Sequence, residues 1–442
     1  MKKKRKINGQ KIFSFVSFIF IVVCILWYGG RFVYFYLDNK KTEVKEANTL
    51  ARALIKENKD SDYFQAVNQD YYFKGDALNN YLMYSNVMWR IVKINQDNRI
   101  TLISENVLGT LGNGKKEYTE SNVIHWLNKV DNDSNSGVLE RVLSNSSDLL
   151  VKSRVCVDTS DNTKKISCDK VNQDYLIGLL SLEDYSHTGG NKGFIHNDKV
   201  TYLSNKNKKK ESWYITEEGK LDVDSNQDVL GVRPVITLNS SVEAISGKGT
   251  SDDPYVLRED KNYFARYVKL GDDLFQVYDV KDGVLKLSLN QVLENDGESF
   301  KYSYGKNTYQ YNDTVYGSLA YYLNRTYYNR LSYKSIIFEN SYVNGFYSSE
   351  NSFSSDDIFK NVISTKVSIP SVLDIVVNDS LGKYLLASGV DEDSTSIYVR
   401  DNGGVVNTQS VRTEGNVVPC ISIHETDLKT GSGTKDDPYR TE

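Results

Sequence analysis

Histidine and cysteine are scarce in this chain, with four of each among 442 residues. The histidines are scattered without an HExxH motif, and the cysteines form no C-x-x-C pair, so a zinc site is not expected. A hydrolytic triad needs a nucleophile with a base held nearby, and no G-x-S-x-G nucleophile elbow occurs. These absences favour a protein that is not an enzyme.

Beyond residue 30 the chain is not basic. Its formal net charge is −4, and because residues 1–30 hold six basic and no acidic residues, the remainder carries −10. That charge argues against nucleic acid as a partner. The 39% of hydrophobic residues excludes a wholly disordered chain, and the length suits two or three ordinary domains.

The longest uncharged run lies near the N-terminus. Residues 12–30 carry no charge and are rich in Phe, Ile and Val, and aromatic residues continue to position 36. A helix of this length approaches the roughly 30 Å hydrocarbon core, and the Lys/Arg cluster before it orients the N-terminus to the cytoplasm. The pattern predicts a cytoplasmic tail over 1–11 and an uncleaved anchor with an interfacial end over 12–37. A cleaved signal peptide is the alternative, but its apolar core would be shorter and end at an A-x-A-like site.

Helix formers follow the predicted anchor. Apolar residues recur near helical spacing at positions 44, 47, 50, 54 and 55. This spacing predicts a helical stalk over 38–61 that lifts the rest of the chain off the bilayer. The apolar repeat covers fewer than the three or four heptads that would establish a coiled coil, and a solvated charged face is the simpler interpretation.

Proline is rare, and its placement points to an internal duplication. Four of the five prolines form two matched pairs. Pro234 in GVRPVI matches Pro419 in NVVPCI, and Pro254 matches Pro438 in two copies of G-x-G-T-x-D-D-P-Y. Self-similarity of this kind is the signature of a repeated structural unit.

The duplication extends towards the N-terminal side of both copies. Alternating apolar runs around a polar turn predict β-hairpins over 87–103 and 273–288. Amphipathic helices that end in Leu-Asn are predicted next, over 118–128 and 311–324, with Thr119 and Asp313 as capping residues.

A second helix is predicted in each copy, after a short apolar strand. Ser181 and Ser371 are its expected capping residues. The sequence therefore predicts an α+β protein in which the transmembrane helix and stalk precede two homologous modules. Module 1 spans 62–257 and module 2 spans 258–442, each with a curled antiparallel sheet and two helices.

The order of these motifs carries a resemblance. A hairpin, a helix ending W-L-N, "IGLLSLEDY", "WYIT", "GVRPVI" and the D-P-Y motif follow one another. This order resembles tandem extracellular modules of uncharacterised surface proteins from low-GC Gram-positive bacteria. Those modules look distantly similar to C-type-lectin-like domains of the sulfatase-modifying-factor type, and the resemblance implies a lectin-like fold. Formylglycine-generating enzymes need a cysteine pair in their cleft that no position here matches, so their activity is not implied.

Two residues of these motifs are candidates for ligand contact or for a structural role. They are Trp213 in "WYIT" and Arg233 in "GVRPVI". The sequence matches Trp213 with Tyr384 and Arg233 with Val418 in the second copy. If Arg233 contacts a ligand or supports the core, module 2 has lost that residue.

Two cysteines are predicted to form a disulfide. Cys156 and Cys168 bracket a polar loop on the predicted oxidising side of the membrane. By the chain-entropy estimate a loop of that size would contribute about 3 kcal/mol, and two free thiols are the alternative. Cys24, inside the predicted anchor, and Cys420, in the last core strand, are expected to be packing residues.

The two D-D-P-Y motifs allow two interpretations. Their acids could offer calcium the oxygen ligands that it prefers, although no EF-hand pattern is present. Turn chemistry favours a structural role, in which the glycines allow turns, an aspartate caps one and the tyrosine packs back on the module. No cofactor is expected, with calcium as the alternative. The residues concerned are Asp252, Asp253, Tyr255, Asp436, Asp437 and Tyr439.

Two further segments could contact a ligand. Tyrosines cluster over 302–316 and 321–328 among 32 in the chain, and exposed tyrosines can stack on sugars or anchor protein contacts. The lysine-rich segment 204–210 is expected to be a solvated loop, with contact to anionic wall polymers as the alternative.

Together these features predict a single-pass membrane protein with a cytoplasmic N-terminus and an extracellular bulk. Its tandem ectodomain is expected to bind or scaffold a cell-envelope or host-surface ligand, a glycan or a surface protein, without catalysis. The alternative is a structural subunit of a cell-envelope or secretion/pilus-like assembly, in which the membrane helix and stalk make the contacts.

Overall fold

The computed structural model describes residues 27–28, 30–31, 49–114, 117–129, 137–159, 168–224, 229–258, 262–305, 311–343, 362–390, 395–401 and 405–442. The predicted tail, most of the predicted anchor, and residues 38–48 of the predicted stalk lie outside these residues. None of the helices in the described ranges is both long and apolar enough to cross a membrane.

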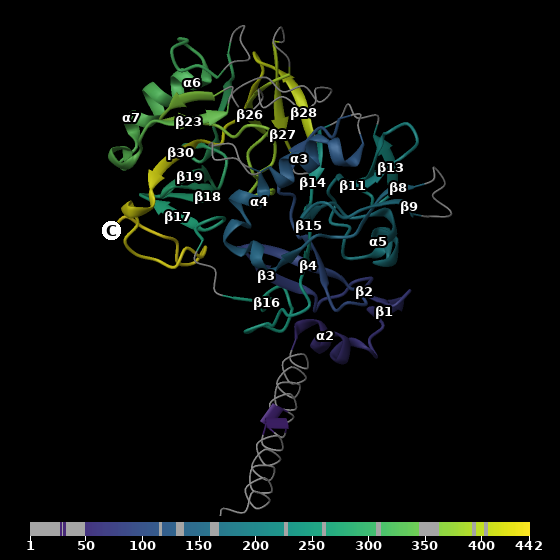
Figure 1. Cartoon of the computed structure of the whole chain (residues 1–442). Helices are drawn as coiled ribbons and strands as arrows, with labels where there is room; N and C mark the ends of the chain where they lie inside the picture. Colours follow the sequence, from purple (N-terminus) through teal and green to yellow (C-terminus); the bar gives the residue numbers. More distant parts are fainter. Residues whose placement is uncertain are drawn as a thin grey trace, which may run out of the picture.

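The fold is mixed α+β and consists mostly of strands in several sheets (Figure 1). Module 1 contributes a nine-stranded sheet with a central order of six strands. That order is β1 (Phe64–Val67), β2 (Asp70–Phe73), β4 (Val87–Ile94), β5 (Ile100–Ser104), β15 (Val235–Leu238) and β10 (Ile177–Gly178). Off this path, β3 (Tyr81–Tyr84) pairs with β4 and with β16 (Tyr255–Val256), and β7 (Leu150–Val151) pairs with β15.

Module 2 contributes a five-stranded sheet that repeats part of this order. Its strands are β17 (Tyr267–Leu270), β18 (Asp273–Lys281), β19 (Val284–Leu289), β30 (Cys420–His424) and β25 (Val367–Ser368). They follow one another as β3, β4, β5, β15 and β10 do in module 1. Both predicted hairpins are present, and each has a register shift at the same place, between Ile91 and Lys93 and between Val277 and Asp279.

A third, ten-stranded sheet contains strands of both modules. Its main order is β13 (Leu221–Asp224), β12 (Ser212–Ile215), β11 (Thr201–Lys206), β14 (Val229–Val232), β28 (Val405–Ser410), β27 (Ser396–Arg400) and β26 (Tyr384–Gly389). Strand β6 (Gly109–Leu111) pairs with β14, β8 (Val155–Thr159) pairs with β11, and β9 (Cys168–Asn172) pairs with β8. Because β14 pairs with β28, the modules share one continuous sheet and one hydrophobic core.

The remaining strands of the described ranges form three two-stranded sheets. They are β20 (Glu294–Asn295) with β21 (Glu298–Ser299), β22 (Lys301–Ser303) with β29 (Glu414–Asn416), and β23 (Asn340–Val343) with β24 (Val362–Thr365).

Helices are few and short. Module 1 carries α3 (Asn122–Asn128), α4 (Val138–Arg141) and α5 (Leu182–His187). Module 2 carries α6 (Leu319–Tyr322), which continues through a π-helical segment, Leu323–Tyr327, into α7 (Tyr328–Arg330).

Helix α2 (Leu50–Asn58) lies where the sequence predicts the end of the stalk. It packs on module 1 and does not stand apart from it, since Leu50, Ala51 and Leu54 are buried and the Leu50 N–H donates to the Val242 carbonyl at 2.8 Å. Figure 1 shows α2 at the end of the molecule formed by module 1.

The asparagine that ends the first predicted helix of each module has a clear structural role. The Asn128 amide donates to the Ile177 carbonyl at 2.8 Å, and its oxygen accepts from the Ile177 N–H at 3.1 Å. Asn324 makes the same two bonds with Val367, at 2.8 and 2.9 Å. The helices are capped by Ser121 and Ser318, so the prediction of Thr119 and Asp313 was wrong.

The second predicted helix forms in module 1 only. The Ser181 hydroxyl accepts from the Asp184 N–H and caps α5, as predicted. In module 2, Ser371 starts a turn, in which the Asp374 carboxylate accepts from both the N–H and the hydroxyl of Ser371. The chain then runs through β-branched residues of low helix propensity, and the Val376 N–H donates to the Leu108 carbonyl. The expectation of two helices in each module was therefore wrong for module 2.

Candidate functional site

Arg233 is a structural residue of module 1. Its side chain is buried, and the guanidinium donates to the carbonyls of Ser104 at 2.8 Å and Ile195 at 2.5 Å. Burial lowers its pKa to about 10. Val418, at the matching position, is buried in the apolar core of module 2. Arg233 thus holds two backbone carbonyls of module 1 from a buried position.

Trp213 is also buried, and the strand register corrects its predicted counterpart. Thr201 of β11 pairs with Ile215 of β12, and Tyr384 of β26 pairs with Arg400 of β27. Strand β26 therefore corresponds to β11, and Tyr384 corresponds to Thr201. The register makes Tyr398 of β27, not Tyr384, the equivalent of Trp213, so the match made from the sequence was wrong by one strand.

The two D-D-P-Y motifs form loops of the same shape. Gly249 and Gly433 have φ angles of +78° and +76°, and an added Cβ would lie 2.3 Å from the Tyr255 ring or 2.4 Å from the Tyr439 ring. The Gly249 carbonyl accepts from the N–H of the first residue of β3, and the Gly433 carbonyl accepts from that of β17. Each loop thus attaches the end of its module to equivalent strands, β3 in module 1 and β17 in module 2.

The acids of these loops are exposed and lie beside basic side chains. Asp253 is 3.9 Å from the Lys248 ammonium, and Asp437 is 3.1 Å from the Arg440 guanidinium. Asp252 and Asp436 are exposed as well. In the part of the chain that the structure describes, no group of three or more His, Cys, Asp or Glu residues could hold a metal ion.

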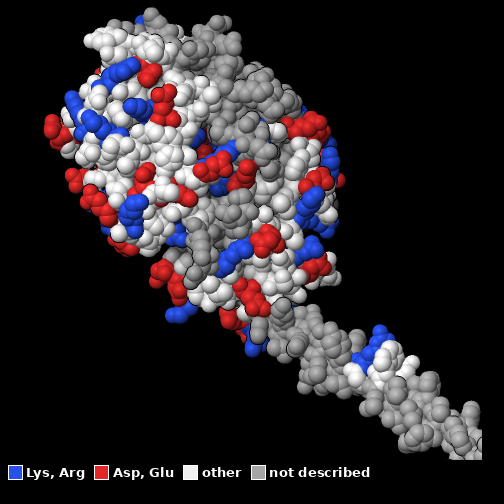
Figure 2. Space-filling model, turned by 60° about the vertical axis from the view of Figure 1, so that its left-hand side comes forward, with Lys and Arg blue, Asp and Glu red and all other residues white. Residues whose placement is uncertain are grey.

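The remaining candidate segments divide between core and surface. Tyr304 and Tyr311 are buried, whereas the Tyr316 side chain is 80% exposed. Within the predicted loop 204–210, residues 204–206 belong to the buried strand β11, and Lys208 and Lys209 are exposed. On the face shown in Figure 2, acidic and basic side chains are interspersed and form no continuous surface of one sign.

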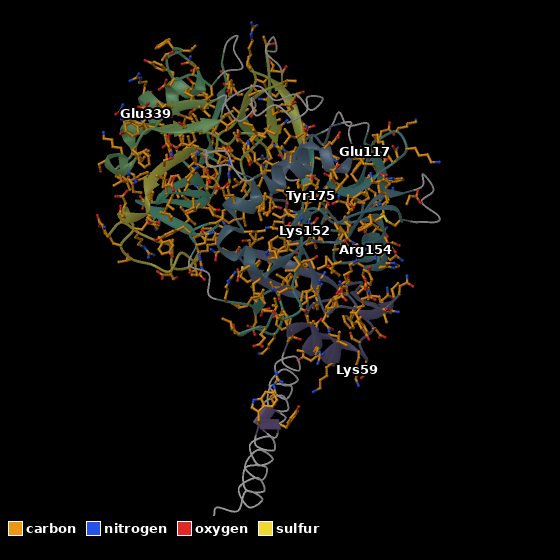
Figure 3. The ribbon with its side chains drawn as sticks, viewed as in Figure 1. Lys59, Glu117, Lys152, Arg154, Tyr175 and Glu339 are labelled. Atoms are coloured by element: carbon orange, nitrogen blue, oxygen red, sulfur yellow. A yellow bond between two sulfur atoms is a disulfide. The ribbon has the colours of Figure 1, made fainter. Side chains whose placement is uncertain are left out.

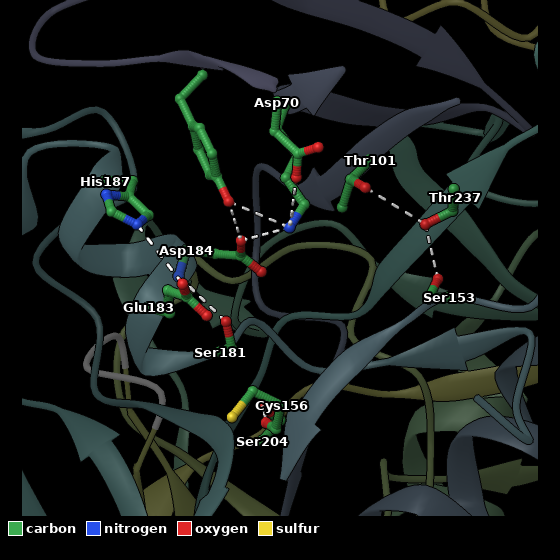
Figure 4. Close-up of polar contacts among 12 residues, drawn as sticks. Asp70, Thr101, Ser153, Cys156, Ser181, Glu183, Asp184, His187, Ser204 and Thr237 are labelled. Carbon is green, nitrogen blue, oxygen red and sulfur yellow. Dashed lines mark hydrogen bonds and ion pairs between the residues drawn. The ribbon is translucent and has the colours of Figure 1, made fainter. Parts of the chain in front are cut away.

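Module 1 holds a polar cleft of about 670 Å³ that the sequence did not reveal. One wall comes from β2 and α5, the other from the chain entering β8 and from β9, and the β4–β5 turn closes one end. The Thr101 and Thr237 hydroxyls lie 3.4 Å apart on the floor, and the Thr237 hydroxyl also lies 2.7 Å from that of Ser153 (Figure 4).

A buried charged cluster holds the first wall of the cleft together. The Lys93 ammonium donates to the Asp184 carboxylate at 2.6 Å and to the Tyr72 hydroxyl at 3.2 Å, and that hydroxyl donates to Asp184 at 2.9 Å. Burial acts against both charges. The ion pair nevertheless raises the pKa of Lys93 and lowers that of Asp184 relative to their ordinary values. Both groups therefore stay charged near neutral pH.

Other acids on this wall have partners too. Asp70 accepts from the Gln96 N–H at 3.3 Å and lies 3.9 Å from the Lys93 ammonium. Burial raises its pKa, and the nearby Lys93 and Arg154 charges oppose that rise. The Glu183 carboxylate lies 3.8 Å from the His187 ring (Figure 4).

The predicted disulfide is present and borders the cleft. Cys156 and Cys168 are joined across the β8–β9 hairpin, and both line the cleft. The Ser204 hydroxyl donates to the Cys156 carbonyl at 2.6 Å and attaches this wall to β11 (Figure 4). Cys420 is buried, as expected, and burial raises the pKa of its thiol.

Module 2 closes the equivalent sheet face. The row Lys93, Thr101 and Thr237 corresponds by register to Asp279, Lys286 and Ser422. Asp279 lies 3.6 Å from the Lys286 ammonium and 3.8 Å from the guanidinium of Arg141, on α4 of module 1.

Tyr342 covers Lys286 and Ser422, the other two residues of this row. The Tyr342 hydroxyl hydrogen-bonds to Ser422 at 2.7 Å, and the Lys286 ammonium lies 5.4 Å from the centre of the Tyr342 ring. The three aligned residues of module 2 are accordingly buried. The duplicated sheet thus presents a cleft in module 1 and an internal contact in module 2.

The chemistry of the cleft suits binding. A lysine whose pKa is raised is a poor nucleophile or general base, and an aspartate held ionised by the Lys93 ammonium and the Tyr72 hydroxyl is a poor proton acceptor. The fixed charges and the hydroxyl floor instead offer hydrogen bonds to a polar ligand.

Comparisons with known proteins identify no relative. The chain matches no family model, no curated protein and no solved structure. The resemblance to lectin-like surface modules remains a prediction from the sequence.

Proposed function

We propose that this chain is a membrane-anchored surface protein whose module 1 cleft binds a hydroxyl-rich glycan of the cell envelope or host surface, without catalysis. The observation that supports this proposal most directly is the open cleft of module 1. Its volume of about 670 Å³ falls within the range of small-ligand sites. The equivalent sheet face of module 2 is covered instead by its own Tyr342 and by Arg141 of module 1.

The lining favours a glycan over a protein surface. The core of a protein interface is rich in aromatic and other apolar residues, whereas this cleft is lined chiefly by charged, amide and hydroxyl side chains. Two neighbouring features support surface display. The disulfide beside the cleft is typical of an oxidising compartment, and the basic and uncharged N-terminal segments predict an anchor.

Blocking the cleft tests this proposal. The full chain in detergent micelles should bind isolated bacterial envelopes or an immobilised glycan array. The substitution Gln173→Trp places a bulky ring at an exposed position of the cleft lining. The matched control, Lys220→Trp, alters an exposed residue of the β12–β13 turn.

We expect binding by the native chain and the control, and at least a tenfold loss in the blocked variant, since an occupied cleft cannot admit the ligand. Thermal unfolding would verify that both variants fold. Equal binding by a folded Gln173→Trp protein would contradict the proposal, and binding only to proteins would favour a protein ligand.

The alternative, a structural subunit of an envelope assembly, has one supporting observation. Helix α2 and both modules pack into a single core, as a rigid scaffold would require. Crosslinking in intact cells distinguishes the two functions. A stoichiometric membrane partner unaffected by Gln173→Trp favours the subunit, and a diffuse envelope pattern favours the glycan-binding protein.

A further inference from the structure

Another cavity lies where the two modules meet. It has a volume of about 770 Å³, and among the described residues it shares no lining residue with the module 1 cleft, whose residues Lys152 and Arg154 are labelled in Figure 3. Module 1 contributes the β3–β4 hairpin and the segment between β5 and β6. Module 2 contributes the chain that enters β17, strand β18 and the D-D-P-Y loop. A cavity of this size between two domains is a common place for a small ligand.

Hydrogen bonds between the modules hold the walls of this junction cavity. The Asn86 amide donates to the carbonyls of Asn262 and Phe264 at 2.7 and 3.0 Å. The Val376 N–H donates to the Leu108 carbonyl at 2.8 Å. All of these residues except Asn262 line the cavity. The site is therefore formed by contacts within the chain, which lowers the entropic cost of binding a ligand.

One wall of the junction cavity is built from methionine. The chain has three methionines, and Met83 and Met88 both line the cavity. They are cross-strand partners in the β3–β4 hairpin, and both are partly exposed. A methionine sulfur makes favourable contacts with aromatic rings, and the unbranched side chain adapts to the shape of a ligand. This wall therefore suits a flat aromatic ring.

Two oxygens of the lining residues have hydrogen-bonding capacity to spare. The Ser85 and Gln276 side chains line the cavity and are 1% and 6% exposed. Within the described ranges, the Ser85 hydroxyl and the Gln276 amide oxygen have no hydrogen-bond partner, although buried polar groups are normally bonded. An amide oxygen accepts hydrogen bonds and a hydroxyl can also accept them, so both suit an O–H or N–H donor.

The backbone beside Gln276 is held in an unusual conformation. Ala265, which also lines the cavity, has a φ angle of +58°, and residues with a Cβ seldom adopt this conformation. Its N–H donates to the Val277 carbonyl, and its carbonyl accepts from the Gln276 amide N–H, both at 2.9 Å. Strain of this kind is concentrated at ligand sites. These bonds fix the orientation of the Gln276 side chain.

From these features we infer that the junction cavity binds a small aromatic molecule that carries an O–H or N–H donor, such as a phenol or an indole. Its ring packs on Met83 and Met88, and its donor binds the Ser85 hydroxyl or the Gln276 amide oxygen. The methionine side chains shift to admit the donor, because both oxygens are buried. This site is separate from the glycan-binding cleft and does not depend on the proposed function.

Methionine-methyl NMR of the full chain in detergent tests the inference, because a carbon-13 methyl label gives one signal for each of the three methionines. Met83→Leu and Met88→Leu assign the two cavity signals. The first probe is 2-naphthol. The second, 2-methoxynaphthalene, keeps the ring and lacks the donor, and the third, decahydro-2-naphthol, keeps the donor and lacks the aromatic ring. Dialysis against detergent alone gives the free concentration of each probe.

Four variants locate the binding. Lys435→Trp places a bulky ring on an exposed lining residue, in the D-D-P-Y loop of module 2. Ser251→Trp is the matched control, because Ser251 is exposed at the same position of the module 1 loop and is not part of the lining. Ser85→Ala and Gln276→Leu each remove one of the two oxygens. Thermal unfolding verifies that each variant folds.

We expect 2-naphthol to shift the Met83 and Met88 signals saturably and to bind about fivefold more tightly than either other probe. Lys435→Trp should lose about tenfold in affinity, because its ring overlaps the ligand, and Ser251→Trp should lose none. The preference for 2-naphthol over 2-methoxynaphthalene should disappear in Ser85→Ala or in Gln276→Leu.

Several outcomes would overturn the inference. The site is rejected if 2-naphthol gives no saturable shift of the Met83 and Met88 signals, or if a folded Lys435→Trp protein binds it equally well. Equal binding of decahydro-2-naphthol rejects an aromatic ligand. Equal binding of 2-methoxynaphthalene, or a preference that persists in both Ser85→Ala and Gln276→Leu, rejects the assigned donor contact.

Discussion

Lys93 in module 1 and Asp279 in module 2 occupy the same place, just after the same irregularity in equivalent strands. Their surroundings give them opposite roles. Asp184 of α5 pairs with Lys93 at the edge of an open cleft. Lys286 and Arg141 enclose Asp279, with Tyr342 above the lysine. A duplicated sheet can therefore carry an open cleft in one copy and a contact between copies in the other.

The difference arises from elements outside the shared sheet order. In module 1, the β1–β2 hairpin, α5 and the disulfide-linked β8–β9 hairpin build walls around the face. In module 2, the turn at Ser371 replaces α5, and the β23–β24 hairpin brings Tyr342 over the sheet. The open cleft thus depends on these additions and not on the repeated hairpin.

The largest effect is expected where module 2 buries its charges. Asp279→Asn leaves Arg141 and Lys286 buried without their shared anion, and should lower the free energy of unfolding by about 4 kcal/mol. Urea denaturation of the full chain in detergent measures this. Asp272→Asn, in the exposed turn before β18, is the control and should change stability by less than about 0.5 kcal/mol. A similarly small change in Asp279→Asn would show that the contact between the modules does not need this charge.

A smaller loss is expected at the matching position of module 1. Lys93→Met leaves Asp184 buried without a cation and should cost about 3 kcal/mol. Adding Asp184→Leu removes the isolated charge and should recover at least half of that loss. If the stability loss of the double variant equals the sum of the losses in Lys93→Met and Asp184→Leu, the two residues do not act as a pair.

The pH dependence sharpens this test. Asp184 has a folded pKa below its ordinary value of 3.8, so its stabilising contribution is present above pH 3.8 and is lost as the pH falls through the folded value. Lys93 has a folded pKa above 10.5, so its contribution is present below pH 10.5 and is lost as the pH rises through the folded value. The deficit of Lys93→Met should therefore shrink at both extremes, and growth of the deficit in acid would contradict the assigned pair.

The smallest change in the free energy of unfolding is expected for Tyr342, which covers Lys286 and Ser422 in module 2. Tyr342→Phe removes one buried hydrogen bond to Ser422, which keeps a bond from Asn340. The expected loss is about 1 kcal/mol in thermal or urea unfolding. Tyr316→Phe is the control, because that side chain is 80% exposed. An unchanged Tyr342→Phe protein would mean that the ring alone closes this face.

Local patterns predicted much of the fold. The two hairpins, the Ser181 cap and the Cys156–Cys168 disulfide depend on residues close together in sequence, and all are present. The second helix of module 2 failed because Ser371 resembles Ser181 as a cap, while the β-branched residues that follow Asp374 favour extended chain.

The cleft could not be predicted in the same way. Its charged cluster joins β2, β4 and α5, and more than one hundred residues separate Tyr72 from Asp184. One signal was present. Lys93 interrupts the apolar strand VMWRIVKI, and a lysine at such a position needs a buried partner. No local pattern identifies that partner, because the pairing depends on how distant elements pack.

The docking of α2 has a mechanical consequence. Its buried face and the bond from Leu50 to Val242 make residues 50–58 part of the module 1 core. Torque or tension applied through the chain before residue 49 would therefore reach module 1 directly, with no swivel at this helix. Since β14 pairs with β28, the same load would pass across the shared sheet to module 2, and both copies would turn together.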